Sequence, residues 1–169
     1  TAGGWIHGGG VIPLLSGAEI TGTIPAVLGG IDYSSPSHCV LFLHANKGIT
    51  FALAAIRASY GEHRTAAFRA VAGITSRDGL ADLWVLVDGK DRFRSRQATN
   101  SQGAFSINVP IHATDRFLTL AATDGGDGIV ADWTMFGDPL LELSPKAADR
   151  HYEGSLRDRP QSAAEEGKK

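Results

Sequence analysis

Short segments of alternating apolar and polar residues, separated by turn residues, constrain the fold of this chain more than any other feature. Residues 105–111 have the two-residue period of a strand with one buried face. Residues 83–87 are apolar at every position, as in a central strand, and the Asp88–Gly89–Lys90–Asp91 segment after them is typical of a hairpin turn. The middle of the chain is therefore predicted to be β-structure.

Similar patterns predict β-strands over much of the remaining chain. Further strands are predicted at the apolar segments 39–43, 48–51, 117–122, 131–135 and 140–143, and one short helix at 53–60. Short strands joined by glycine- or aspartate-containing turns favour an antiparallel β-sandwich or barrel over alternating strand–helix units. Sandwich loops gather at the two ends, where binding sites are common. We expect an all-β fold with at most one or two short helices.

The length of 169 residues corresponds to about one domain. Residues 1–10 are rich in glycine and predict an irregular lead-in. Residues 146–169 carry six Lys or Arg and five Asp or Glu with few large apolar side chains, which predicts a flexible charged tail. The folded domain is therefore predicted over 11–145. Because the sequence starts at Thr1 without a leader, we expect a processed protein or a piece of a longer one.

Composition and motifs argue against several classes of function. The 16 Lys and Arg against 18 Asp and Glu give a net charge of -2, without the basic excess of a nucleic-acid binder. The apolar runs are too short for membrane insertion. One cysteine, Cys39, excludes an internal disulfide, a zinc finger and an iron–sulfur cluster. The local motifs of serine hydrolases, zinc proteases and nucleotide-binding enzymes are absent from the sequence.

An acidic, glycine-rich segment at 123–133 is the most informative candidate site. Asp124, Asp127 and Asp132 fall within nine residues, around glycines that let the backbone turn sharply. Calcium takes six to eight oxygen ligands, often carboxylates and main-chain carbonyls of one loop, so these three residues are candidate calcium ligands. The alternative is that Asp124 and Asp127 shape the turn through hydrogen bonds to the backbone. A pair of glycosidase carboxylates is a further alternative.

Aromatic and basic residues supply candidate sugar contacts. Trp133 adjoins Asp132, and an indole beside a polar group can pack on a sugar ring while the polar group binds hydroxyls. His44 and Asn46, at the end of a predicted strand, are candidate ligand residues of a binding loop or part of an ordinary polar turn. Arg92 and Arg94 alternate along another strand; they are candidates to bind an acidic glycan, or they form a solvated face.

Four segments in order resemble the NPCBM domain family. Residues 44–53 resemble its "HA-x-x-x-I-x-(F/Y)-x-L" stretch, and residues 68–74 its "F-x-A-x-x-G" strand. Residues 84–90 are similar to its hairpin ending in "D-G-K", and residues 117–133 to its closing "D-x-G-D-G … D-W" segment. Where many members read "D-H-A-D-W", this chain has Ile129–Val130–Ala131–Asp132–Trp133. The resemblance covers about residues 44–143.

The resemblance implies a jelly-roll, galactose-binding-like sandwich, which often holds a structural calcium. It implies a non-catalytic module that binds a glycan, including galactose-containing ones, as one domain of an exported or surface bacterial protein. We therefore expect an extracellular, periplasmic or cell-surface location, with the other domains of the parent chain as partners. The alternative is a structural or protein-interaction domain with the same fold and no sugar site. A small hydrolase is the third hypothesis.

Overall fold

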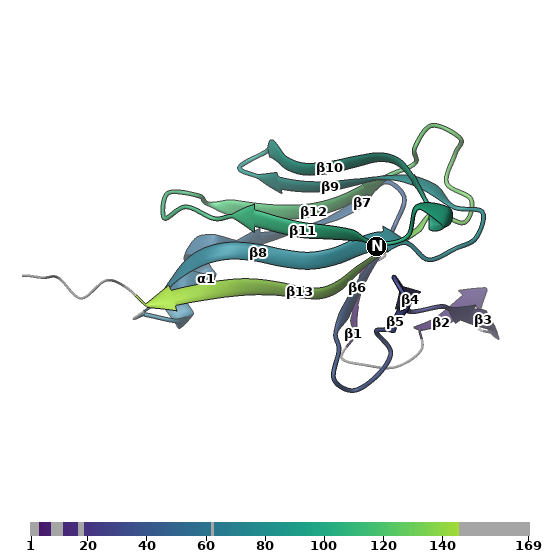
Figure 1. The fold of residues 1–169 in the computed structure, drawn as a ribbon, viewed down its shortest axis with the longest axis horizontal. Coiled ribbons are helices and arrows are strands. Elements are labelled where there is room, and N and C mark those ends of the chain that lie inside the picture. Colours follow the sequence, from purple (N-terminus) through teal and green to yellow (C-terminus); the bar gives the residue numbers. More distant parts are fainter. Residues whose placement is uncertain (1–3, 8–11, 17–18, 62, 146–169) are drawn as a thin grey trace, which may run out of the picture.

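Two antiparallel β-sheets pack face to face in this protein (Figure 1). The structure is a computed structural model that describes residues 4–7, 12–16, 19–61 and 63–145. One sheet has the strand order β1-β6-β13-β8-β11 and the other the order β10-β9-β12-β7. The predicted all-β antiparallel sandwich is confirmed.

The elements follow the chain in this order: β1 (Gly4–His7), β2 (Ile12–Ser16), β3 (Glu19–Ile24), β4 (Val27–Leu28), β5 (Ile31–Asp32), β6 (Val40–His44), β7 (Lys47–Ala52), α1 (Leu53–Ser59), β8 (His63–Ile74), β9 (Leu80–Val87), β10 (Lys90–Thr99), a short 3₁₀ helix (Asn100–Gln102), β11 (Phe105–Pro110), β12 (Phe117–Thr123) and β13 (Trp133–Pro145). Strands β2 and β3 form a separate hairpin, as do β4 and β5. The α-helix α1 lies where the sequence predicts it.

The main core lies between the two sheets and is formed by the inward-facing residues of each strand. In β9, Leu83, Val85 and Val87 are buried there, whereas Trp84 and Leu86 are half-exposed on the outer face. The apolar run 83–87 predicted a central strand, and β9 does lie between β10 and β12. Only one face of its sheet packs on the other sheet, so Trp84 and Leu86 lie outside the core.

A second apolar cluster covers the outer face of the five-stranded sheet. Tyr33, from the segment after β5, packs with Phe42 of β6 and Met135 of β13, and Trp133 lies at the border of the cluster. The Tyr33 side chain is 1% exposed. The sequence of residues 25–36 does not predict this cluster, because it lacks the period of a long strand.

Strand β13 joins two segments that were predicted as separate strands, 131–135 and 140–143. Between Gly137 and Leu140 it contains one residue more than its partner β8, so the turn-like Asp138 and Pro139 form a β-bulge. Asp138 has a positive φ of 44°, and proline is tolerated at a bulge because its missing N–H is not required there. The predicted turn is therefore a kink within one strand.

The glycine-rich lead-in differs from its predicted irregular structure. Gly4–His7 form β1, which pairs with β6 from Gly4–Leu43 to His7–Val40. The edge of β6 offers main-chain groups that any backbone can pair with, glycine included. At the other end, β13 ends at Pro145, and the predicted flexible tail at 146–169 lies outside the described residues. No helix in the described part of the chain is long and apolar enough to cross a membrane.

Candidate functional site

Two loops meet at one end of the sandwich and bring His44 and Trp133 together. His44 is the last residue of β6 and Trp133 the first residue of β13, and the two are directly paired across the strands. The ring centroids lie 4.7 Å apart, with an angle of 73° between the rings. Both side chains are half-buried. The edge-on contact fixes the plane of the indole at the end of the sheet.

Asn46 lies close to this pair in the chain, in the turn that joins β6 to β7. Its φ of 60° is in the left-handed region, which asparagine tolerates better than most residues. The side chain is exposed. Lys47, the next residue, pairs with Ala122 near the end of β12, so the turn and the acidic loop that follows β12 lie at the same end of the sandwich.

Asp132 is buried inside this end of the fold, with 0% exposure. One carboxylate oxygen accepts a hydrogen bond from the Leu80 N–H at 3.0 Å, and the other, Oδ2, is buried with no partner among the described residues. The pKa of Asp132 is raised mainly by burial; the Leu80 bond and His44 lower it, while Asp127 and Asp124 raise it. The charges of His44, Asp127 and Asp124 therefore act on the Asp132 carboxyl group.

The acidic loop folds tightly over the start of β9. Asp124 Oδ1 accepts a hydrogen bond from Gly126 N–H at 3.2 Å, as the turn-shaping alternative predicted. A Cβ on Gly79 would lie 2.5 Å from the Ala131 carbonyl oxygen, so a glycine is needed where the loop crosses this strand end. Asp127, by contrast, is exposed at the outside of the loop.

A polar hollow of about 400 Å³ lies beside the loop. It is lined by Asp82, Arg96, Gln97, Asp124, Gly125 and Gly126. Asp82 accepts the Gln97 N–H at 2.7 Å, and its other oxygen lies 3.8 Å from Arg96 Nε. Asp82 and Gln97 were not among the predicted site residues, because the bulge in β10 near Gln97 leaves no clear period in the sequence.

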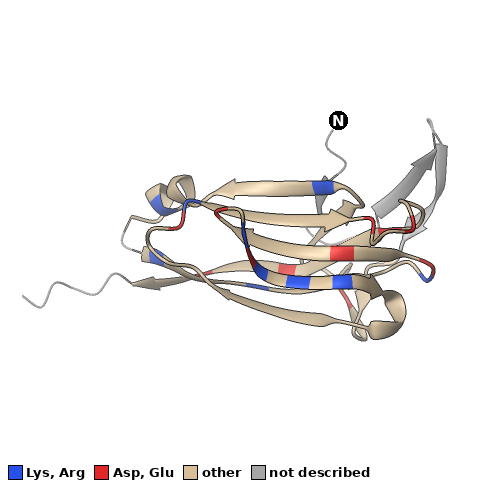
Figure 2. Ribbon diagram, turned by 90° about the horizontal axis from the view of Figure 1, so that it is seen from above, with Lys and Arg blue, Asp and Glu red and all other residues tan. Residues whose placement is uncertain are grey.

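Arg92 and Arg94 lie elsewhere. Figure 2 shows basic residues following one another along β10, at the edge of the four-stranded sheet. Arg94 forms an ion pair with Asp91 at 3.2 Å, and its guanidinium lies 5.3 Å from the centre of the Trp84 ring on the outer face of that sheet. His44 and Trp133 border the opposite outer face, so the structure does not bring the two arginines to the same site.

Calcium at this end of the fold would need oxygen ligands from several residues. In the described part of the chain, no three His, Cys, Asp or Glu side chains form a group that could hold a metal ion. The unpartnered Asp132 Oδ2 supplies one buried carboxylate oxygen. The described side chains therefore fit a calcium ion only in part. Calcium needs six to eight oxygen ligands, and the others would have to include main-chain carbonyls.

Two aliphatic residues in the loop are a feature that the structure adds. Ile129 is 53% exposed and Val130 83% exposed, just before Ala131, whose φ is 64°. They stand at the two positions where the chain departs from the "D-H-A-D-W" pattern. The pair adjoins Asp132 and Trp133 in the chain.

Comparisons with known proteins agree with this architecture. The family model of the NPCBM/NEW2 domain matches residues 43–142. The comparison with curated proteins finds no match. Among solved structures, the fold resembles CBM51 from Clostridium perfringens GH95 in complex with methyl-galactose, at 22% identity and a TM-score of 0.59, over 82% of this chain and 92% of that chain.

Two further structures contain similar modules within longer chains. One is the M60 catalytic domain with the CBM51-1 and CBM51-2 domains from Clostridium perfringens ZmpB (24% identity, TM-score 0.58, 83% of this chain and 14% of that chain). The other contains the tandem CBM51 modules of Sp3GH98, the family 98 glycoside hydrolase from Streptococcus pneumoniae SP3-BS71 (18% identity, TM-score 0.55, 74% of this chain and 36% of that chain). At these identities the likeness establishes the fold, which is the galactose-binding-like sandwich that the resemblance implied.

Proposed function

Because this chain belongs to the NPCBM/NEW2 domain family, we propose that it is a non-catalytic carbohydrate-binding module of a larger exported or surface bacterial protein. Such a module holds its parent protein on a glycan and performs no reaction of its own. The similar modules in the M60 and family 98 structures, which occur beside other domains, support this role.

The pairing of His44 with Trp133 is the observation that carries the proposal. Rings from two strands far apart in the sequence meet at a loop-bearing end of the sandwich. A half-buried indole held by a neighbouring ring offers an apolar face for a sugar ring. Asn46 and Asp127, exposed in the two adjoining loops, provide groups for hydrogen bonds to hydroxyls.

A galactose-containing glycan is the ligand class that we propose to test first. The support is the fold shared with a CBM51 module whose structure is in complex with methyl-galactose. A shallow, largely preformed surface of this kind gives weak binding, with a Kd of roughly 1 μM to 1 mM. Arg92 and Arg94 remain predicted contacts for an acidic glycan on a separate face.

Calcium at the acidic loop is part of the proposal, with Asp132 Oδ2 as its buried carboxylate ligand and main-chain carbonyls of the loop among the other ligands. The ion would neutralise the buried carboxylate and fix the loop beside Trp133. Calorimetric titration with calcium chloride tests this. We expect the midpoint of thermal unfolding to rise with calcium in the wild type and not in Asp132→Asn. A wild type with no binding heat and no shift contradicts the calcium site.

A glycan array probed with the purified chain, with and without EDTA, tests the sugar-binding role. We expect binding to galactose-containing glycans, and Trp133→Ala to weaken it at least tenfold. Trp84→Ala is the matched control, since Trp84 lies on the outer face of the other sheet beside Arg94, and should bind as the wild type does. Absence of binding to all glycans, or equal losses in both variants, contradicts the proposal.

A protein-interaction domain is the second candidate function, and the exposed Ile129 and Val130 favour it. Exposed aliphatic groups at a loop tip are typical contacts of a protein partner. Replacement of both residues by Ser separates the two functions. If the loop binds protein, the double variant loses interaction with the neighbouring domains of the parent chain while glycan binding is unchanged.

A further inference from the structure

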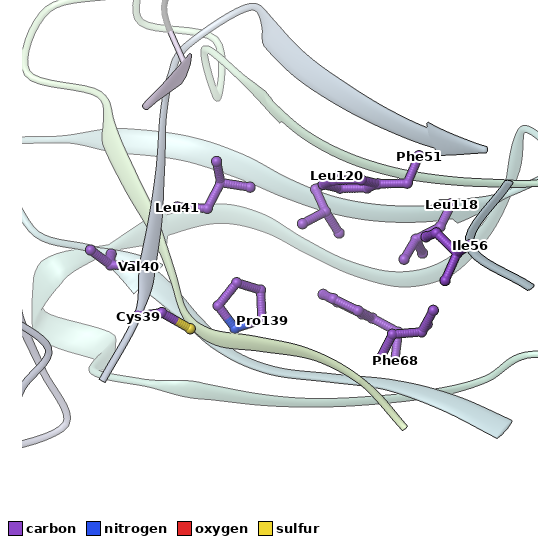
Figure 3. A pocket seen from close by; sticks show the side chains of 10 residues that line it. Cys39, Val40, Leu41, Phe51, Ile56, Phe68, Leu118, Leu120 and Pro139 are labelled. Carbon is purple, nitrogen blue, oxygen red and sulfur yellow. The ribbon is translucent and has the colours of Figure 1, made fainter. Parts of the chain in front are cut away.

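An apolar cavity of about 260 Å³ lies at the side of the sandwich, away from the loop end that carries His44 and Trp133 (Figure 3). It is lined by Cys39, Val40, Leu41, Phe51, Ile56, Phe68, Leu118, Leu120, Pro139 and Leu141. These residues come from both sheets and from α1, and the labelled side chains surround the open space in Figure 3. Among these lining residues, only Cys39 has a side chain that can form a hydrogen bond, through its thiol.

The cavity has a buried floor and an accessible rim. Leu41, Phe68, Leu118 and Leu120 in the floor are all 3% exposed or less. The rim residues, such as Ile56 and Leu141, are only half-buried. A ligand can therefore reach the cavity from the side of the sandwich and bury itself between the sheets.

Polar contacts hold one side of the rim in place. Asp138, in the bulge of β13, accepts the Cys39 N–H at 2.9 Å and contacts His38 Nδ1 at 2.7 Å. Its own N–H donates to the Cys39 carbonyl at 2.8 Å. These bonds tie β13 to the start of β6 at the point where Pro139 and Cys39 line the cavity.

Hydrogen bonds also hold helix α1, which forms the opposite side of the cavity rim. The Arg57 guanidinium donates to Thr65 Oγ1 at 3.1 Å and to the carbonyls of Asp115 and His112 at 2.7 and 2.8 Å. These bonds anchor α1 beside the cavity, and native interiors contain few voids of this size.

We propose that this cavity binds an uncharged alkyl chain. An apolar cavity of about 150 Å³ stays dry and admits benzene, so a larger one with the same kind of lining has room for a longer hydrocarbon. The lining offers no partner to a charged or strongly polar group, which excludes the sugar ligand of the loop end from this site. Burial, and then the charge of Asp138, raises the pKa of the Cys39 thiol, so the thiol stays neutral.

Calorimetric titration with a series of linear alcohols from butanol to decanol tests the proposal. Affinity is expected to rise about three- to fourfold per added methylene and to level off when the chain fills the cavity. Leu141→Phe, which fills the cavity from the rim, should weaken decanol binding at least tenfold. Leu140→Phe is the matched control, because Leu140 is 56% exposed beside it and does not line the cavity. Equal binding by both variants, or no saturable binding by the wild type, overturns the proposal.

The single cysteine gives a second readout that needs no core substitution. Cys39 lines the cavity and is the only thiol in the chain, so saturating decanol should slow its alkylation by a maleimide at least fivefold in the folded wild type. The alkylation rate of the chain unfolded in urea, measured with the same decanol, is the control. An unchanged rate in the folded protein contradicts occupation of the cavity, whatever the stability of Leu141→Phe. The result is independent of glycan binding.

Discussion

The His44 imidazole lies edge-on to the Trp133 indole, with 4.7 Å between the ring centroids, although the two residues come from strands far apart in the sequence. The contact exists because β6 and β13 are neighbours in the five-stranded sheet and are in register at this position. A direct cross-strand pair of rings is a rigid arrangement, and rigidity is what a sugar-binding indole requires.

A double-mutant cycle measures this contact. His44→Ala, Trp133→Ala and the double variant are expected to give a coupling free energy of about 0.5–1.5 kcal/mol in urea unfolding. The reason is that each single variant removes the same ring pair. The same cycle on Phe51, which lines the cavity between the sheets, and Trp84, on the outer face of its sheet, is the control and should give additive effects. Additive effects at His44 and Trp133 as well would show that the contact carries no free energy.

The stability of the domain is expected to depend on the protonation of Asp132. Burial raises the pKa of Asp132 in the folded chain, so folding favours the protonated form. That contribution is complete below the unfolded pKa of about 3.9 and is lost as pH rises through the higher folded value. In calcium-free buffer, the free energy of unfolding of the wild type should therefore fall relative to Asp132→Asn between pH 4 and pH 7. Urea unfolding at each pH measures the difference, and parallel profiles would contradict it.

Asp138 should make the stability of the domain depend on pH in the opposite direction. Burial disfavours its charge, but the Cys39 N–H and His38 outweigh burial and lower the pKa of Asp138. The stabilising contribution is present above the unfolded pKa of about 3.9 and is lost as pH falls towards the lower folded value. Asp138→Asn is thus expected to be less stable than the wild type at pH 6, with a gap that narrows below pH 4. Thermal unfolding at each pH measures the difference in stability between the wild type and Asp138→Asn. A difference that stays constant down to pH 2.5 would contradict the lowered pKa of Asp138.

Gly79 is expected to be required for the position of the acidic loop. A Cβ at this position would lie 2.5 Å from the Ala131 carbonyl oxygen and 2.8 Å from Ile74 Cγ2, so Gly79→Ala forces the loop away from β9. We expect a loss of about 1–3 kcal/mol in the free energy of unfolding, together with weaker glycan binding.

Gly61→Ala is the control for that substitution. Apart from its chain neighbours, no atom of the described residues lies within 4 Å of a Cβ added there, and the alanine should leave stability unchanged or raise it by about 0.5 kcal/mol. If urea unfolding gives the same change in the free energy of unfolding for both variants, the position of the acidic loop does not depend on the close contact between Gly79 and the Ala131 carbonyl.

Much of the fold could be predicted from the sequence because its signals are local. The alternation at 105–111 became β11, with Ile107 and Val109 buried, and the helix predicted at 53–60 became α1. The family pattern over about 44–143 agrees with the family match at 43–142. In each case the period or pattern lies within a few neighbouring residues, and a strand or helix satisfies it wherever it is placed.

The candidate site was predicted only in part. His44, Trp133 and the acidic loop do meet at one end, but Arg92 and Arg94 lie on the other sheet. Nothing local distinguishes Asp132, whose carboxylate points into the fold, from the exposed Asp127.

Short strands with one apolar face follow from the order of residues, because the two-residue period of side chains is a property of each strand. Packing of the whole chain set which strands are neighbours, where the bulge in β13 falls, and which polar groups are buried. Those outcomes depend on contacts between segments far apart in the chain. Their free energy comes from packing two sheets together, and no single segment contains that information.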